Sequence, residues 1–212
     1  MTTTEITSPV MAGPAPSRRT TIACGLGGAA LSVAAVVALG DPLRGAGSGE
    51  AVTQSLVAVA GAVQLSALLA GLSAAALLVA SVALGARAGA WGRVLALGGV
   101  LTSVLMAAYF AAFGGGALVA TQVLDEVGPG LGEATLVAAN QTGLLRYVGG
   151  VLLLGAAASA GLRRSASLPR LVGWSAVAFL VLLVVPMTGW IVALVLPVWL
   201  GVVAAAVAWR DR

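Results

Sequence analysis

The sequence predicts an all-α membrane protein with six transmembrane helices and both termini in the cytoplasm. Of its 212 residues, 60% are hydrophobic and 8% are charged, whereas a soluble domain carries roughly 25% charged residues. The apolar residues gather into six runs, each close to the roughly 20 residues that a spanning helix needs. Arginines separate these runs and favour alternate loops. Together these observations predict contact with a lipid bilayer along most of the chain.

The first span is predicted over residues 20–40, after a polar segment rich in Thr, Pro and Ser. That composition predicts a disordered cytoplasmic tail over residues 1–17. A signal peptide has a similar order of charges and apolar residues, and residues 38–40 resemble a cleavage site. The run of about 21 residues is longer than the usual apolar region of about 7–15 residues. We therefore expect an uncleaved span.

The second, third and fourth spans are predicted over residues 51–85, 94–124 and 131–162. As continuous helices they measure roughly 46–52 Å, whereas the hydrocarbon core is about 30 Å thick. Arginines mark their cytoplasmic ends, so the excess length predicts that these helices extend beyond the outer leaflet. Alternatively, the glycines at residues 114–116 end the third helix and leave an irregular loop up to Ala139.

The last apolar stretch is predicted to form two spans, residues 171–186 and 189–208. A single helix over the whole stretch would measure about 57 Å, which is too long for one crossing. Pro186 and Gly189 supply a break and a turn between the two spans. Residues 18–212 are thus expected to form one transmembrane domain.

The orientation follows from the arginines, because cytoplasmic segments of membrane proteins are rich in Lys and Arg. With the N-terminus inside, the outer loops contain only Arg44. The inner segments contain Arg18, Arg19, Arg87, Arg93, Arg163, Arg164, Arg170, Arg210 and Arg212. The high content of Ala, Gly, Val, Leu and Arg is typical of a bacterial protein, so we expect the bacterial cytoplasmic (inner) membrane.

Several function classes are disfavoured by what the chain contains. It has no His and no Lys, which excludes His-ligated haem and Schiff-base cofactors, and its one cysteine, Cys24, cannot form an intrachain disulfide. The arginines lie between apolar runs and form no clustered basic surface, so no nucleic-acid partner is expected. No span carries paired acids. We therefore expect no enzyme activity, no cofactor and no metal site.

Arg146 is the strongest candidate for a functional residue, because a guanidinium inside an apolar run needs water, an anion or a partner. If the fourth helix enters the membrane near Thr142, the side chain can snorkel to the headgroups. Small residues on its helix face, however, indicate close packing and an inward arginine. These are Ala139, Thr142, Gly143, Gly149 and Gly150. The predicted acceptors for the inward arginine are Asp125, Glu126, Glu133, Asp41 and Gln64.

Other polar residues are weaker candidates. Gln64 shares a face with small residues and predicts a hydrogen bond to a neighbouring helix, with a substrate contact as the alternative. The remaining cavity candidates are Asn140, Gln141, Tyr109 and Tyr147. The outer acidic residues either attract cations to an outward mouth or simply populate the loops. They are Asp41, Glu50, Asp125, Glu126 and Glu133.

Residues 167–210 carry the patterns LPR-x-x-GW at Leu168–Trp174 and LP-x-W-L at Leu196–Leu200. With the layout of the loops, these resemble a family of small bacterial membrane proteins that carry a domain of unknown function and about six helices. The resemblance implies a six-helix membrane fold. It implies no activity and no site residues.

Two functional hypotheses follow. The first is a non-enzymatic scaffold or accessory subunit that packs Gly/Ala-rich helix faces against itself or another membrane protein. The alternative is a channel, transporter or small-lipophile-binding protein with an outward cavity near Arg146 and Gln64. A bundle packed dry around Gly143, Gly149 and Gly150 favours the scaffold, whereas a cavity open to water or lipid favours the alternative.

Overall fold

The computed structural model describes residues 16–40, 48–122, 130–163 and 166–210, and these residues form helices and no strand. Five helices are long and apolar enough to cross a membrane. They are α1 (Arg18–Leu39), α3 (Ala60–Arg87), α4 (Gly92–Gln122), α5 (Gly130–Leu162) and α7 (Pro186–Arg210). The chain is therefore a multi-pass membrane protein whose apolar outer surface contacts the bilayer. Residues 1–15 of the predicted tail lie outside the described part, and Ser17 belongs to the fold, because its side chain caps α1.

The predicted span over residues 171–186 forms α6 (Arg170–Val184), a helix of 15 residues. Its length of about 22 Å is less than the roughly 30 Å of a hydrocarbon core. Val185 interrupts the helix, and α7 begins at Pro186. Proline suits the first helical position because the missing N–H has no partner there in any case. The predicted break is confirmed, but the turn predicted at Gly189 is wrong, because this residue lies inside α7. Helix α6 is also shorter than a full crossing.

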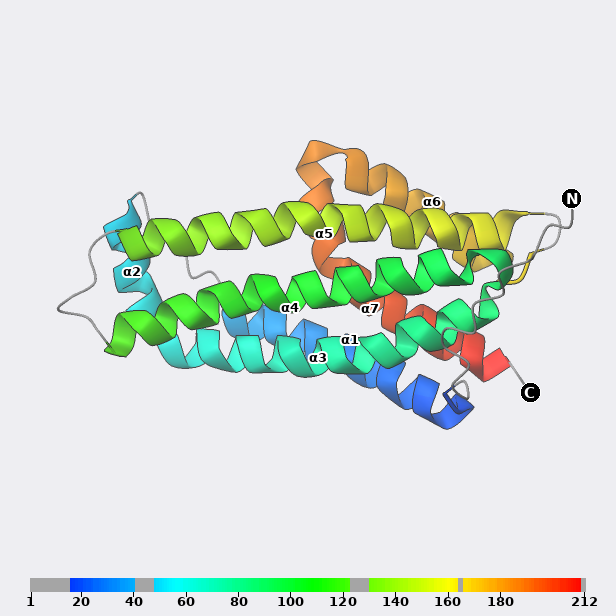
Figure 1. Ribbon diagram of the computed structural model, residues 1–212, viewed down its shortest axis with the longest axis horizontal. Helices are drawn as coiled ribbons and strands as arrows, with labels where there is room; N and C mark the ends of the chain where they lie inside the picture. The colour runs from blue at the N-terminus through cyan, green and yellow to red at the C-terminus, as the bar shows by residue number, and fades with distance from the viewer. Residues whose placement is uncertain (1–15, 41–47, 123–129, 164–165, 211–212) are drawn as a thin grey trace, which may run out of the picture.

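The start of α1 and the end of α7 lie at the same end of the bundle (Figure 1). Nη2 of Arg18 donates a hydrogen bond to the carbonyl oxygen of Trp209 at 3.2 Å. The end of α5 meets the turn before α4 at the same end, since Cζ of Arg163 lies 5.1 Å from the Trp91 ring centroid. We call this the terminal end. The opposite end is the α2 end, after the short helix α2 (Gly49–Ala58).

The predicted second span is two helices, because α2 and α3 are separated at Val59, whose φ of −114° and ψ of 18° are not helical. A continuous helix over residues 51–85 is thus wrong. The break lets Val52 and Leu56 of α2 pack in a separate apolar cluster with Phe113 of α4 and Ala139 of α5. Burial of these side chains offsets the interruption of the helix. The α2 end therefore has its own small core.

The glycines at residues 114–116 do not end a helix, and α4 continues through them to Gln122. A methyl group on Gly114 would lie 2.8 Å from Cβ of Ala67, so this glycine allows α3 and α4 to approach. Gly116 similarly faces Thr135 of α5. The alternative of an irregular loop to Ala139 is wrong, since α5 begins at Gly130. Packing against the neighbouring helices explains these glycines. As predicted, α3, α4 and α5 are each longer than the roughly 30 Å thickness of a hydrocarbon core.

The helices at the terminal end pack backbone to backbone. A methyl group on Gly25 of α1 would lie 2.5 Å from the carbonyl oxygen of Gly201 in α7. One on Gly161 of α5 would lie 2.7 Å from Cα of Gly173 in α6. Such contacts substitute for the hydrophobic effect, which does not drive helix association within lipid. In Figure 1, α7 runs obliquely from the α6 turn, past α5 and α4, towards α1.

Candidate functional site

Arg146 lies at the middle of α5, sixteen residues from either end of the helix. At about 1.5 Å per residue, it is about 24 Å from each end. The side chain is only 4% exposed. The arginine therefore points into the bundle, and the snorkelling alternative is wrong. The arginine points inward because α5 packs closely against α4 beside it, where Gly149 contacts Thr102 of α4.

The guanidinium has few partners for its five N–H donors. Nη1 donates to the Sδ atom of Met106 at 3.0 Å, and a thioether is a weak acceptor. Cζ lies 5.2 Å from the centroid of the Tyr109 ring, a cation–π distance. Nε is buried and has no hydrogen-bond partner. Among the described residues, no carboxylate forms an ion pair with Arg146.

The predicted acceptors do not satisfy this arginine. Glu133 is thirteen residues earlier on α5, about 20 Å away along the axis, and its side chain is exposed. Gln64 is exposed on α3. The other three candidates, Asp41, Asp125 and Glu126, lie outside the described residues. The positive charge of Arg146 is therefore not neutralised within the described part of the chain.

The arginine lines a surface cleft with a volume of about 460 Å³ between α4, α5 and α7. Both polar and apolar side chains line it. The lining residues are Tyr109, Ala139, Asn140, Gly143, Leu144, Arg146, Tyr147, Trp190 and Leu194. Leu144 and Trp190 are 63% and 57% exposed, so they stand at the mouth. The cleft thus combines a buried cation with an apolar entrance.

Tyr109 is held in place by two aromatic neighbours on its own helix. Its ring centroid lies 5.6 Å from that of Phe110 and 5.3 Å from that of Phe113, both in edge-to-face arrangements. Both phenylalanines are fully buried. Edge-to-face pairs add roughly 0.5–1.5 kcal/mol beyond burial. The ring beneath the guanidinium is therefore fixed before any ligand arrives.

The structure brings together some of the predicted polar residues and separates others. Asn140 and Tyr147 line the cleft beside the arginine. Gln141 is exposed and does not line it. The interior hydrogen bond predicted for Gln64 is wrong, because the buried face of α3 carries other residues, among them Val63 and Ser66. Successive residues of an α-helix are rotated by about 100° about its axis, so Gln64 points in a different direction from its buried neighbour Val63.

The outer acidic residues do not gather at the cleft. Glu50 lies in the first turn of α2 and Glu133 in the first turn of α5. Both are exposed. A carboxylate in the first turn of a helix interacts favourably with the partial positive charge of that helix end. These two residues are thus explained by helix stability alone.

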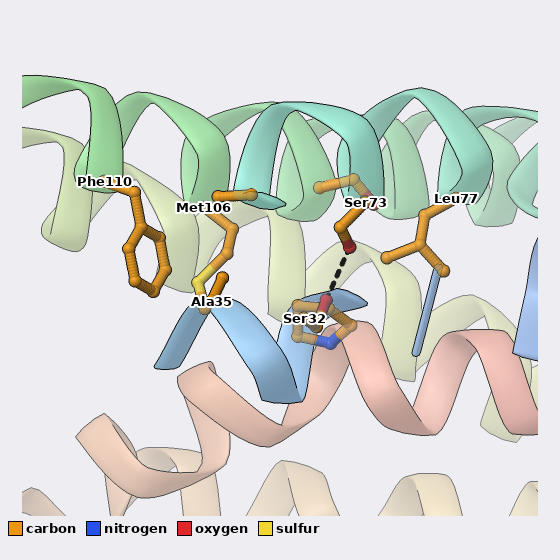
Figure 2. A pocket seen from close by; sticks show the side chains of 9 residues that line it. Ser32, Ala35, Ser73, Leu77, Met106 and Phe110 are labelled. Carbon is orange, nitrogen blue, oxygen red and sulfur yellow. Dashed lines mark hydrogen bonds between the residues drawn. The ribbon is translucent and has the colours of Figure 1, made fainter. Parts of the chain in front are cut away.

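A second hollow is enclosed between α1, α3, α4 and α7 (Figure 2). The hydroxyls of Ser32 and Ser73 lie 2.7 Å apart, and Ser73 donates to the carbonyl oxygen of Gly28 at 2.8 Å. Because Ser73 has a single hydroxyl proton, Ser32 must be the donor between the two serines. Met106, Phe110 and other apolar groups close the space, which leaves no room for a water molecule. It is a packing gap with a satisfied polar contact.

A third hollow, of about 630 Å³, lies at the terminal end beside Arg18, Arg19 and Trp209. Arg18 already donates to the Trp209 carbonyl, and its Cζ lies 5.7 Å from the indole ring. Arginine and tryptophan at helix ends are typical of the headgroup region. This hollow is therefore explained by the membrane interface, whereas the Arg146 cleft is not.

Sequence reasoning missed Met106, Trp190 and Leu194 as neighbours of the arginine. Each stands in an apolar run and has no spacing relation to residue 146, because it comes from another helix. The pair Ser32 and Ser73 was missed for the same reason. Only the distance between helices brings these residues together.

No family model, curated protein or solved structure matches this chain. The resemblance carried by residues 167–210 remains a prediction. The function is accordingly argued from the residues of the cleft.

Proposed function

We propose that this is a bacterial inner-membrane protein that binds a small amphipathic molecule in the cleft beside Arg146. One observation carries the proposal: a guanidinium that is 4% exposed lines a cleft of about 460 Å³ and pairs with no described carboxylate. An arginine at a helix centre in the bilayer costs about 2.5–3.5 kcal/mol on insertion scales. A residue that costs this much without an ion pair is usually kept for function.

The proposed orientation places the terminal end in the cytoplasm, because most arginines outside the cleft lie there. Measured from that end of α5, Arg146 is about 24 Å deep in a core of about 30 Å. It then lies in the outer half of the membrane, roughly one helical turn below the outer headgroups. The α2 end, with its separate core, projects beyond them.

Binding is a better proposal than conduction or transport. Below the cleft, towards the terminal end, Gly98 of α4 lies against the backbone of Leu153 in α5. This contact closes the space between two of the helices that line the cleft. The predicted partner residue Gln64 does not line the cleft either. The geometry therefore supports a site that is open on one side.

The test uses two matched glycines of α5. Gly143 lines the cleft, and a Cβ atom added there meets no other atom within 4 Å. Gly155 has the same open surroundings but does not line the cleft. Gly143→Leu should therefore fill the cleft without disturbing helix packing, while Gly155→Leu serves as the control.

Binding of a fluorescent single-chain lipid to the purified full chain in nanodiscs is the measurement. Gly143→Leu should weaken binding at least tenfold, and Gly155→Leu should change it less than twofold. Equal affinities of the wild type and both variants for the lipid would show that the cleft is not the binding site. Size-exclusion profiles establish that both variants are folded.

A scaffold role is the second candidate, and one exposed face favours it. Gly61 and Gly71 of α3 lie on either side of Gln64, and nothing approaches either glycine within 4 Å. By contrast, Gly149 and Gly150 are used inside the molecule, against α4 and against α6 and α7. If the α3 face binds a second copy, Gly71→Leu should shift the chain from dimer to monomer in single-molecule photobleaching. An unchanged distribution would exclude this face.

A further inference from the structure

We infer that the molecule bound in the cleft is an amphipathic anion, with a carboxylate or phosphate head on Arg146 and an apolar chain directed to the lipid. The inference rests on the proposed function and specifies the class of ligand. It has two parts, the charge of the head and the apolar character of the rest. Each part is carried by different residues.

The charge of the head follows from the unused donors. Nε of Arg146 is buried without a partner, and Nη1 contacts only the sulfur of Met106. The planar guanidinium presents N–H groups in a fork that matches a carboxylate or phosphate. Binding such a group in the cleft would give the guanidinium charge-assisted hydrogen bonds in addition to its weak sulfur contact.

The remaining polar groups of the cleft are consistent with an anion. Asn140 supplies an amide, and Tyr147 and Tyr109 each have a hydroxyl that can donate. Among the described residues, none that lines the cleft is acidic. A cationic or zwitterionic head would bring a positive group next to an arginine whose charge is not neutralised. An anion is the complementary partner.

The guanidinium is also held ready for an anion. Its attraction to the Tyr109 ring, at 5.2 Å, engages the positive charge rather than the hydrogen-bond donors. The ring itself is fixed by Phe110 and Phe113. Because the arginine is positioned before binding, little side-chain entropy is lost when the ligand enters.

The apolar part follows from the mouth of the cleft. Leu144 and Trp190 line the cleft and are exposed on the outer surface of the bundle. Helix α6 lies along only the C-terminal half of α5 (Figure 1) and ends at Val184. The entrance faces lipid, so a chain can lie in the bilayer while its head reaches the arginine.

The test compares ligands that share one chain and differ in the head. Oleyl phosphate, oleate and oleyl alcohol are each titrated against the purified full chain in neutral nanodiscs, at a pH where oleate is ionised. We expect both anions to bind at least tenfold more tightly than the alcohol. Arg146→Gln should reduce this preference to less than threefold, whereas Arg93→Gln, at an exposed position of α4, should retain it.

Inorganic phosphate distinguishes the two sources of an anionic head. If the ligand is an amphiphile, millimolar phosphate should displace oleyl phosphate less than twofold. Strong displacement by phosphate would show that the site takes a free anion from water, and would overturn the apolar part of the inference. If Arg146→Gln does not fold, Arg146→Lys serves as the second variant. Its single ammonium group keeps the positive charge but lacks the forked N–H groups of a guanidinium. The ratio of anion to alcohol affinities should then lie between those of the wild type and an uncharged variant.

The outcomes separate this inference from the proposed function. If Gly143→Leu abolishes binding of all three ligands and the wild type does not discriminate between heads, the cleft binds lipophiles and the anionic head is refuted. If Gly143→Leu has no effect on any of them, the proposed function fails and the inference fails with it. Tenfold discrimination that is lost in Arg146→Gln supports both.

Discussion

Replacing Arg146 by methionine should make the empty protein more stable. The side chain is 4% exposed and its charge has no described carboxylate partner, so the wild type carries an uncompensated cation inside the bundle. Methionine is apolar, unbranched and adapts its shape to irregular space, although it is shorter than arginine. The substitution thus removes the charge and keeps an apolar side chain at this position.

The size of the effect can be worked from the contacts. An arginine at the bilayer centre costs about 3 kcal/mol, and this is an upper limit for Arg146, which the proposed orientation places in the outer half of the membrane. The cation–π contact with Tyr109 recovers about 1 kcal/mol, and the hydrogen bond to the Met106 sulfur recovers about 1 kcal/mol. The difference predicts that Arg146→Met raises the free energy of unfolding by up to about 1 kcal/mol.

The assay is reversible unfolding in mixed micelles of detergent and SDS, with and without oleyl phosphate. Without ligand, Arg146→Met should be the more stable protein. A ligand at a hundred times its dissociation constant should then add about 2.7 kcal/mol to the wild type and little to the variant. The order of stability should therefore reverse.

A loss of more than about 1 kcal/mol in the ligand-free variant would refute this reasoning, because it would show that the arginine stabilises the bundle. Arg93→Met is the control. Arg93 is exposed at the start of α4, so its replacement should change the free energy of unfolding by less than about 0.5 kcal/mol.

Three further predictions concern packing and topology. Gly98→Ala should lower the free energy of unfolding by about 1–3 kcal/mol, because its methyl group would lie 2.7 Å from an α5 backbone carbon. Gly155→Ala, with open space around it, should not lower it. Ser73→Ala should cost about 1 kcal/mol in the same unfolding assay, through loss of its interhelical hydrogen bonds. In a cysteine-free background, Gln54→Cys should react with an impermeant thiol reagent from outside the cell and Ala90→Cys should not. The reverse pattern would contradict the orientation.

Most of the fold was predictable because its determinants are local. A run of about 20 apolar residues must be helical in lipid, since no water satisfies its backbone groups. The break near Pro186 was predictable for a similar reason, because proline removes a donor. The interruption at Val59 was not, since it depends on how α2 packs against Phe113 of α4.

The glycines at residues 114–116 show why local rules are insufficient. Flexibility of the glycine backbone predicts a helix end as readily as a packing surface. The structure selects the second, because Gly114 faces Ala67 and Gly116 faces Thr135. The neighbouring helices determine that these glycines form a packing surface, and no residue spacing within α4 specifies that outcome.

The candidate site was predictable in part. The small residues beside Arg146 predicted an inward arginine, and its burial confirms this. The same reasoning was wrong for Gln64, because this side chain and the neighbouring Gly61 and Gly71 are exposed on α3. Small residues on a face permit close approach, but they do not show that a helix is there to approach.

The sequence by itself determined that the chain is a helical membrane protein, approximately where its helices begin and end, and that Arg146 needs a partner. These properties depend on hydropathy, length and charge, which are set along the chain. Only the tertiary structure decided how each helix is rotated about its axis and which faces meet. That rotation leaves Arg146 against Met106 and Tyr109, beside an open cleft and without a described carboxylate. The physical reason is that contacts between helices arise from distances that no periodicity within one helix specifies.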